Sequence, residues 1–206
     1  AIDNYKNGLK YFPKKPIVLW FIGRSFERIG NVDQSEEFYE LSLDALPKSK
    51  LNKQEKKMKV KALLSLGRVL YSTQQYDSAI LHLQELVAFD PKYKKAYALL
   101  SDIYVDLKEI DKAKNYCFQG IDNDEFAYEL YVRLARIFND QEKYDSAVEY
   151  ANYSLEKAEK FRVKNYGPAL IELGSAHVNL CNRVAAEDAF YRAKSYDRRQ
   201  VSQLQE

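Results

Sequence analysis

The sequence predicts an all-α fold in which antiparallel helix pairs stack one after another as an α-solenoid. The chain repeats itself with a period of about 34 residues, and one copy follows another at Ala79, Ala113 and Ala147. Upstream of each alanine, again at a constant distance, stands another small residue, namely Gly67, Ser101 and Ala135. Small residues at both places allow two helices to cross closely. Only seven glycines and five prolines occur in 206 residues, which also favours helices over a turn-rich β-sandwich.

The clearest copy of the repeat is LLSLGRVLYSTQQYDSAILHLQELVAFDP, which runs from Leu63 to Pro91. This copy resembles the tetratricopeptide repeat, a helix-turn-helix unit, in its large residue, Leu-Gly pair, aromatic residue, alanine and closing proline. The stretch YDSAI of this copy returns as YDSAV at 144–148. The resemblance covers the whole chain and implies a right-handed superhelix, with residues 1–206 as a single array.

Five repeats are predicted, at residues 16–47, 60–93, 94–127, 128–160 and 163–198. Residues 1–13 fit the second half of a preceding unit, because Pro13 stands one period before Pro47. Residues 199–206 form either a short capping helix or a truncated continuation. Because the first unit is incomplete, the compartment stays open; the cytoplasm is favoured and an exported form is kept as the alternative.

The turn inside each repeat is marked by Gly30-Asn31 in the first repeat and by the polar stretches TQQ, KE and QEK in the next three. An aspartate follows in the first turn of the second helix, where a carboxylate suits the positive end of the helix. These aspartates are Asp33, Asp77, Asp111 and Asp145.

Residues 48–59 form a lysine-rich insertion, because Gly23 and Gly67 are further apart than one period. Asn52 and Glu55 have capping-box spacing, so we expect a longer connection and then a lengthened first helix. Seven lysines in KSKLNKQEKKMKVK form either a solvated helix extension or a basic patch for an acidic partner or nucleic acid. The segment has no aromatic residue or arginine for base recognition, which argues against nucleic acid.

Nothing in the sequence predicts an enzyme, a metal site or another cofactor. His82 and His177 belong to different repeats, and Cys117 and Cys181 are two repeats apart, too far for a disulfide. No CxxC, HExxH, phosphate loop or nucleophile elbow occurs. The charge is nearly balanced, with 32 basic against 30 acidic side chains, and the apolar run Ile17–Ile22 is too short to span a bilayer.

In the family that the sequence resembles, the first helices line a concave groove that holds a peptide or helix of a partner protein. The residues that directly follow the small residues lie there in this register, and three of the five are arginines. They are Arg24, Arg68, Asp102, Arg136 and Ser175. Together with neighbouring inward positions, the predicted partner-binding set is Trp20, Arg24, Lys61, Arg68, Tyr71, Lys95, Asp102, Arg133, Arg136 and Asn139. Arginine beside aromatic residues suits a carboxylate-bearing peptide.

Two alternatives remain for these residues. The arginines can instead pair internally, with Glu27, Asp102, Asp106, Glu129 or Asp140 on adjacent helices. Trp20 can be a core residue instead of a groove residue. The lysine and asparagine set with which some family members grip chaperone C-termini is absent, since Ser65 and Leu99 stand at counterpart positions.

The leading hypothesis for function is a non-catalytic adaptor or assembly scaffold that binds a protein segment in its groove, with acidic segments among the candidates. A regulatory peptide-sensing domain of a larger protein is the alternative, and a nucleic-acid-binding helical repeat is a third reading. The sequence leaves the identity of the partner and the oligomeric state open.

Overall fold

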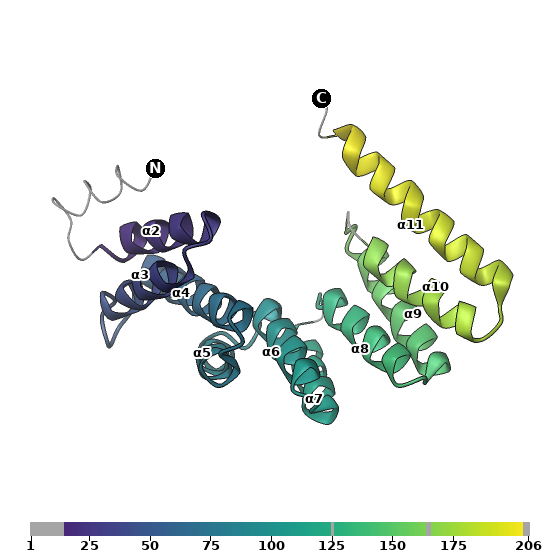
Figure 1. The fold of residues 1–206 in the computed structure, drawn as a ribbon, viewed down its shortest axis with the longest axis horizontal. Coiled ribbons are helices and arrows are strands. Elements are labelled where there is room, and N and C mark those ends of the chain that lie inside the picture. The colour runs from purple at the N-terminus through teal and green to yellow at the C-terminus, as the bar shows by residue number, and fades with distance from the viewer. Residues whose placement is uncertain (1–14, 125, 164–165, 204–206) are drawn as a thin grey trace. The chain divides into compact units, whose positions relative to one another are not determined.

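The computed structural model describes residues 15–124, 126–163 and 166–203, and every regular element in these ranges is an α-helix (Figure 1). The predicted all-α fold of antiparallel helix pairs is therefore confirmed. The chain divides into two compact units, residues 1–99 and 100–206, and each is described by itself. The half-repeat predicted at residues 1–13 lies outside the described residues.

The first unit consists of α2 (Pro16–Arg28), α3 (Val32–Asp44), α4 (Lys53–Ser72), α5 (Tyr76–Phe89) and the beginning of α6 (Lys94–Asp106). Helix α2 packs against α3, and α4 packs against α5. The two pairs stack through contacts of α4 with both α2 and α3. The first helices α2 and α4 therefore lie beside each other and share one face of this unit.

Helix α4 has 20 residues because it starts early, in the lysine-rich segment. The Asn52 side chain accepts hydrogen bonds from the backbone N–H groups of Gln54 and Glu55. In return the Glu55 carboxylate accepts one from the N–H of Asn52 at 2.8 Å. These bonds satisfy donors that have no partner inside the helix. The lengthened first helix and its capping box are confirmed.

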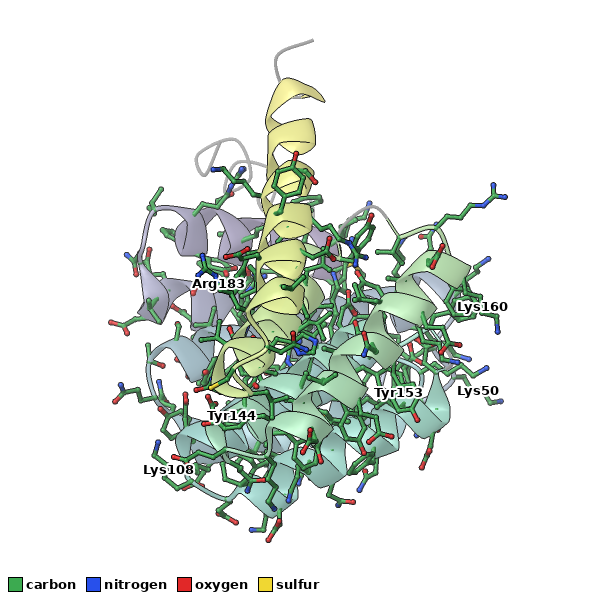
Figure 2. All side chains as sticks on the ribbon, turned by 90° about the vertical axis from the view of Figure 1, so that its right-hand side faces the viewer. Lys50, Lys108, Tyr144, Tyr153, Lys160 and Arg183 are labelled. Carbon is green, nitrogen blue, oxygen red and sulfur yellow. The ribbon has the colours of Figure 1, made fainter. Side chains whose placement is uncertain are left out.

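The second unit contains the rest of α6, then α7 (Ile110–Asn123), α8 (Tyr128–Asp140), α9 (Tyr144–Lys160), α10 (Gly167–Asn179) and α11 (Arg183–Gln203). From α7 to α11 each helix packs against the next, and α8 also contacts α10. The labels Tyr144 and Lys160 in Figure 2 mark the two ends of α9. Ala135 and Gly174 are 39 residues apart, five more than one period, and α9 takes up part of this surplus with its 17 residues, whereas α10 has 13.

The last helix differs from the sequence-based boundary between residues 198 and 199. Helix α11 continues through that point to Gln203. No glycine or proline occurs between Arg183 and Gln203, so nothing in the sequence interrupts the helix. Residues 199–203 are part of α11 and do not form a separate capping helix.

The small residue of each first helix contacts an equivalent residue of the second helix. A Cβ added to Gly67 would lie 2.6 Å from the Cγ of Leu83, and one on Gly174 would lie 2.6 Å from the Cε1 of Phe190. The pairs in contact are Gly23 with Tyr39, Gly67 with Leu83, Ser101 with Cys117 and Gly174 with Phe190, and Ala135 and Ala151 belong to one buried cluster. The close crossing was predicted at the alanine of the second helix, but at the three glycines the nearest side chain belongs to the residue one turn later, which is the larger Tyr39, Leu83 or Phe190.

The turn inside each pair places one residue in the left-handed conformation. Its φ is +60° at Gln74, and the N–H of Gln74 donates to the carbonyl of Tyr71. The N–H of Gln75 donates to the carbonyl of Leu70, which completes a Schellman motif at the end of α4. The equivalent residues are Gly30, Lys108, Glu142 and Cys181. Among these five, only Gly30 adopts this conformation without a steric cost from a Cβ.

Candidate functional site

On the shared face of α2 and α4, two cations lie over one tryptophan ring. The guanidinium carbon of Arg24 is 5.4 Å from the Trp20 ring centroid, and the Lys61 ammonium is 4.8 Å from it. Within the described part of the chain, neither cation has a carboxylate partner. Cation–π contacts of this kind hold the charges in place without neutralising them.

Trp20 itself belongs to the core. Its side chain is only 8% exposed, and its indole N–H donates to the Ser65 hydroxyl at 3.1 Å. The core alternative for Trp20 therefore applies, and a partner would meet Arg24 and Lys61 rather than the indole. Arg24 is exposed and Lys61 is half-buried.

Arg68, about two turns beyond Lys61 on α4, has an internal partner. Its guanidinium contacts the Glu27 carboxylate at 2.6 Å, and the Tyr39 hydroxyl donates to the same carboxylate at 2.6 Å. Burial, followed by the hydrogen bond to Glu27, raises the pKa of Tyr39. Because just over half of the Arg68 side chain is exposed, this pair contributes little to stability, roughly 0–1 kcal/mol.

A pocket of about 470 Å³ opens beside the N-terminal half of α4. It is lined by Lys56, Lys57, Val60, Lys61, Phe89, Asp90 and Tyr93. All three lysines lie on α4, two of them in the lysine-rich segment and Lys61 just after it. Phe89 is the last residue of α5, and Tyr93 directly precedes α6. The fold thus supplies the aromatic side chains that the segment itself lacks.

In the second unit, Arg133 and Asp102 form a paired contact between α8 and α6. The Nε and Nη2 atoms of Arg133 donate to the two oxygens of Asp102, each at 2.9 Å. Both side chains are about one-third exposed or less. The hydrogen bond and charge of Asp102 raise the pKa of Arg133 against the opposing effect of burial. Such a planar two-point contact is the geometry that guanidinium and carboxylate groups favour.

Glu172 on α10 binds two predicted site residues of α8. The Nε of Arg136 donates to one Glu172 oxygen at 2.8 Å, and the Asn139 amide donates to the other at 3.2 Å and to the Glu172 carbonyl at 3.0 Å. The Glu172 side chain is 9% exposed, while that of Arg136 is 61% exposed. A nearly buried carboxylate is thus matched by one cation and one amide.

The pairs of the second unit follow a common register. Asp102, which follows the small residue Ser101, pairs with Arg133, which stands two positions before the next small residue, Ala135. In the same way Arg136, which follows Ala135, pairs with Glu172, two positions before Gly174. In the first unit the second position of this register is occupied by Ser65 and Leu99, which carry no charge. Arg24 therefore lacks a carboxylate there, and Arg68 pairs with Glu27 on the preceding first helix.

Two further predicted site residues lie apart from these clusters. The Tyr71 ring lies 6.1 Å from that of Tyr76, and Lys95 is exposed at the start of α6.

The two cysteines differ in their surroundings. Cys181 is exposed, whereas Cys117 is buried and its thiol donates a hydrogen bond to the Ser101 hydroxyl. Burial raises the pKa of Cys117 to about 11, which keeps this thiol protonated and unreactive at neutral pH.

The alternative of internal pairing thus applies to Arg68, Arg133 and Arg136, and two of their partners, Glu27 and Asp102, were among the candidates from the sequence. Glu172 was missed, although the register that pairs Asp102 with Arg133 also points to it. Phe89 and Tyr93 carry no sequence signal that connects them with the lysines. Their approach depends on how α5 and the segment that follows it pack against α4.

In the described ranges, no group of three or more His, Cys, Asp or Glu side chains could hold a metal ion. No helix in the same ranges combines the length and apolar character needed to cross a membrane.

Comparison with known families gives two matches, both described as tetratricopeptide repeat, at residues 1–50 and 70–136. Together they cover more than half of the chain. Solved structures show the same fold at low sequence identity. The crystal structure of MamA is 20% identical, covers 88% of this chain and 97% of its own, and has a TM-score of 0.64. That of BtubC from P. vanneervenii is 13% identical, with coverages of 97% and 88% and a TM-score of 0.73.

A third structure, YrrB, is described as a tetratricopeptide repeat protein with an unusual peptide-binding site; it is 13% identical, with coverages of 95% and 93% and a TM-score of 0.59. Among curated proteins, Protein O-mannosyl-transferase TMTC1 of Homo sapiens is 22% identical over 135 residues. That match covers 66% of this chain but only 14% of the relative. It is a similarity to a small part of a much longer protein.

Proposed function

Because the chain belongs to the tetratricopeptide repeat family, whose fold generally serves as a non-catalytic protein-interaction scaffold, we propose that it binds a segment of a partner protein on the face shared by α2 and α4. In this role the chain acts as an adaptor or assembly scaffold. The peptide-binding site described for YrrB is in keeping with such a use of the fold.

The observation that carries the proposal is the pair of cations over Trp20. Arg24 and Lys61 are fixed by the ring and lack carboxylate partners among the described residues, so their charge is available to a ligand. A partner carboxylate placed there forms a charge-assisted hydrogen bond, which is stronger than one between neutral groups. The buried, hydrogen-bonded indole keeps the two cations in place before the partner arrives, which lowers the entropy cost of binding.

The proposal is tested by selecting randomised twelve-residue peptides, displayed on phage, on the wild-type chain. We expect peptides rich in aspartate and glutamate to be enriched, and their affinity to fall at least about tenfold in the double variant Arg24→Glu, Lys61→Glu, because the charge that attracts them is reversed. Affinity is measured by fluorescence anisotropy with labelled peptides.

The matched control is Lys108→Glu combined with Lys143→Glu, which changes the net charge equally at two exposed positions of the second unit; Lys108 is labelled in Figure 2. We expect this variant to keep most of the affinity. If no peptide is enriched, or if both double variants weaken binding to the same extent, the proposed face is wrong.

A further inference from the structure

The pocket beside α4 combines an apolar interior with a basic edge. Val60, Phe89 and Tyr93 supply the apolar surface, and Lys56, Lys57 and Lys61 supply three charges. Its volume of about 470 Å³ falls within the range of pockets that hold ligands. The aromatic wall is held in place, since the Lys59 ammonium lies 4.9 Å from the Phe89 ring centroid and 2.7 Å from the Glu85 carboxylate.

The three lysines of the pocket lack carboxylate partners among the described residues, in contrast to Lys59. The one acidic residue of the lining, Asp90, accepts a hydrogen bond from the N–H of Lys92 and so serves the turn after α5. On α4, Lys53, Lys57 and Lys61 follow one another at intervals of four, which places like charges side by side and costs helix stability. This arrangement therefore does not stabilise a helix extension that is merely exposed to solvent.

The chemistry of the pocket therefore fits an anionic ligand with an apolar group. We propose that it binds an acidic protein segment in which one large apolar side chain stands between carboxylates. The apolar side chain enters between Val60, Phe89 and Tyr93, and the flanking carboxylates contact Lys56, Lys57 and Lys61. This inference rests on the proposed function and names the class of segment and its anchor. Lys61 belongs both to the pocket and to the cation pair over Trp20, so one segment contacts both.

A protein segment fits better than a nucleic acid. A single-stranded nucleic acid needs a basic path that follows several phosphates, with bases stacked along it. Here the unpaired lysines gather at one end of α4, and the two aromatic side chains line a pocket and do not form a row. The net charge of the chain, +2, gives no general attraction to polyanions.

Three labelled nine-residue peptides test the inference, each with four glutamates on either side of a central phenylalanine, leucine or alanine. We expect the phenylalanine and leucine peptides to bind the wild-type chain about tenfold more tightly than the alanine peptide, because burial of the apolar side chain contributes. Lys56→Ala combined with Lys57→Ala should weaken all three about tenfold, since both lysines are exposed and their loss removes charge without disturbing the core.

Two further variants address the anchor. Phe89→Ala should abolish the preference for phenylalanine over alanine and leave the affinity of the alanine peptide unchanged. Tyr93→Ser serves as a second variant if Phe89→Ala loses its helical circular dichroism signal. Lys108→Ala combined with Lys143→Ala is the matched charge control and should bind all peptides as the wild type does.

Equal binding of the three peptides by the wild type, or unchanged binding by the Lys56, Lys57 variant, would overturn the inference. A nine-nucleotide oligouridine that binds more tightly than the peptides, and is lost in the same variant, would identify a nucleic-acid site instead. If peptides selected from the random library still depend on Arg24 and Lys61 but not on Lys56 and Lys57, the pocket is wrong and the proposed function stands. If neither the random library nor the three labelled peptides give a bound peptide, the proposed function and the inference about the pocket are both wrong.

Discussion

The two units are built from similar helix pairs, but they differ in the ion pairing of charged side chains on their first helices. In the second unit Arg133 and Arg136 each meet a carboxylate of a neighbouring first helix, Asp102 and Glu172 respectively. In the first unit Arg24 and the pocket lysines Lys56, Lys57 and Lys61 have no such partner among the described residues. Paired charges fasten neighbouring repeats to each other, whereas unpaired charges on a fixed surface are available to a ligand.

The cause of this difference is a change of residue type at one repeated position. Two residues before the small residue, the second unit has Arg133 and Glu172, and the first unit has Ser65 in α4. Ser65 is used instead to hold the Trp20 indole. The residue type at this position thus decides whether the residue after the preceding small residue is paired, as Arg136 is with Glu172, or left as an exposed cation, as Arg24 is.

The largest expected effect comes from reversing the charge of Arg136. In Arg136→Glu a second carboxylate meets Glu172, which is 9% exposed and loses the cation that balances it, so we expect a loss of about 2–3 kcal/mol in the free energy of unfolding. Arg24→Glu, at the equivalent position of the first unit, should change it by less than about 0.5 kcal/mol. Urea unfolding followed by circular dichroism measures both.

Adding Glu172→Gln to Arg136→Glu removes the repulsion and should restore part of the stability. If Arg136→Glu and Arg24→Glu prove equally harmless, the contrast between the two units has no energetic basis.

The glycine at the helix crossing provides a second contrast. Gly67→Ala in the first unit places a Cβ 2.6 Å from the Cγ of the fully buried Leu83, so we expect a loss of about 1–3 kcal/mol by overpacking. Gly174→Ala in the second unit meets the ring of Phe190, which is 39% exposed and can turn outward. Its cost should be close to zero, because alanine also favours the helix. Thermal and urea unfolding of the two variants decide this, and a larger loss for Gly174→Ala would contradict it.

Double-mutant cycles compare the ion pairs themselves. We expect a coupling of about 1–2 kcal/mol between Arg133 and Asp102, which form two parallel hydrogen bonds and are mostly shielded from solvent. The coupling of Arg68 with Glu27 should stay below about 1 kcal/mol, since Arg68 is more than half exposed. Raising the salt concentration to about 0.5 M should reduce the second coupling by the larger fraction. Equal couplings would show that exposure does not separate the two pairs.

The smallest effect is expected at the turns, and it should be alike in both units. Gln74→Gly and Glu142→Gly relieve a Cβ at φ of +60° and +59°, so each should raise the free energy of unfolding by up to about 1 kcal/mol. Lys143→Gly, outside the left-handed position, is the control and should destabilise. A gain in only one unit would mean that the units differ in backbone strain as well as in charge.

Much of the fold could be predicted because it depends on local signals. The repeat period located the helix pairs, and the spacing of Asn52 and Glu55 located the start of α4. The predicted repeat boundary at residue 198 does not coincide with a helix end, because no helix-breaking residue occurs there and α11 continues to Gln203. The repeat period predicts where equivalent contacts recur, whereas the end of a helix depends on local residues such as glycine and proline.

The candidate site was predictable only in part. The sequence placed Arg68, Arg133 and Arg136 at the right register and offered internal pairing as an alternative, but it could not choose between pairing and partner binding. That choice depends on distances of a few ångströms between side chains on neighbouring helices. The Coulomb attraction of an ion pair falls by about half when the separation doubles, and the hydrogen bond between its groups is lost over the same range.

Spacing along the chain was enough to predict an array of helix pairs, the places of its turns and of the α4 cap, and the residues of each first helix that share a face. Tertiary structure decided which charges of that face remain available, and it brought Phe89 and Tyr93 to Lys56, Lys57 and Lys61. Those contacts arise between side chains on different helices. Their geometry is set by how the helices pack against each other, which no local pattern records.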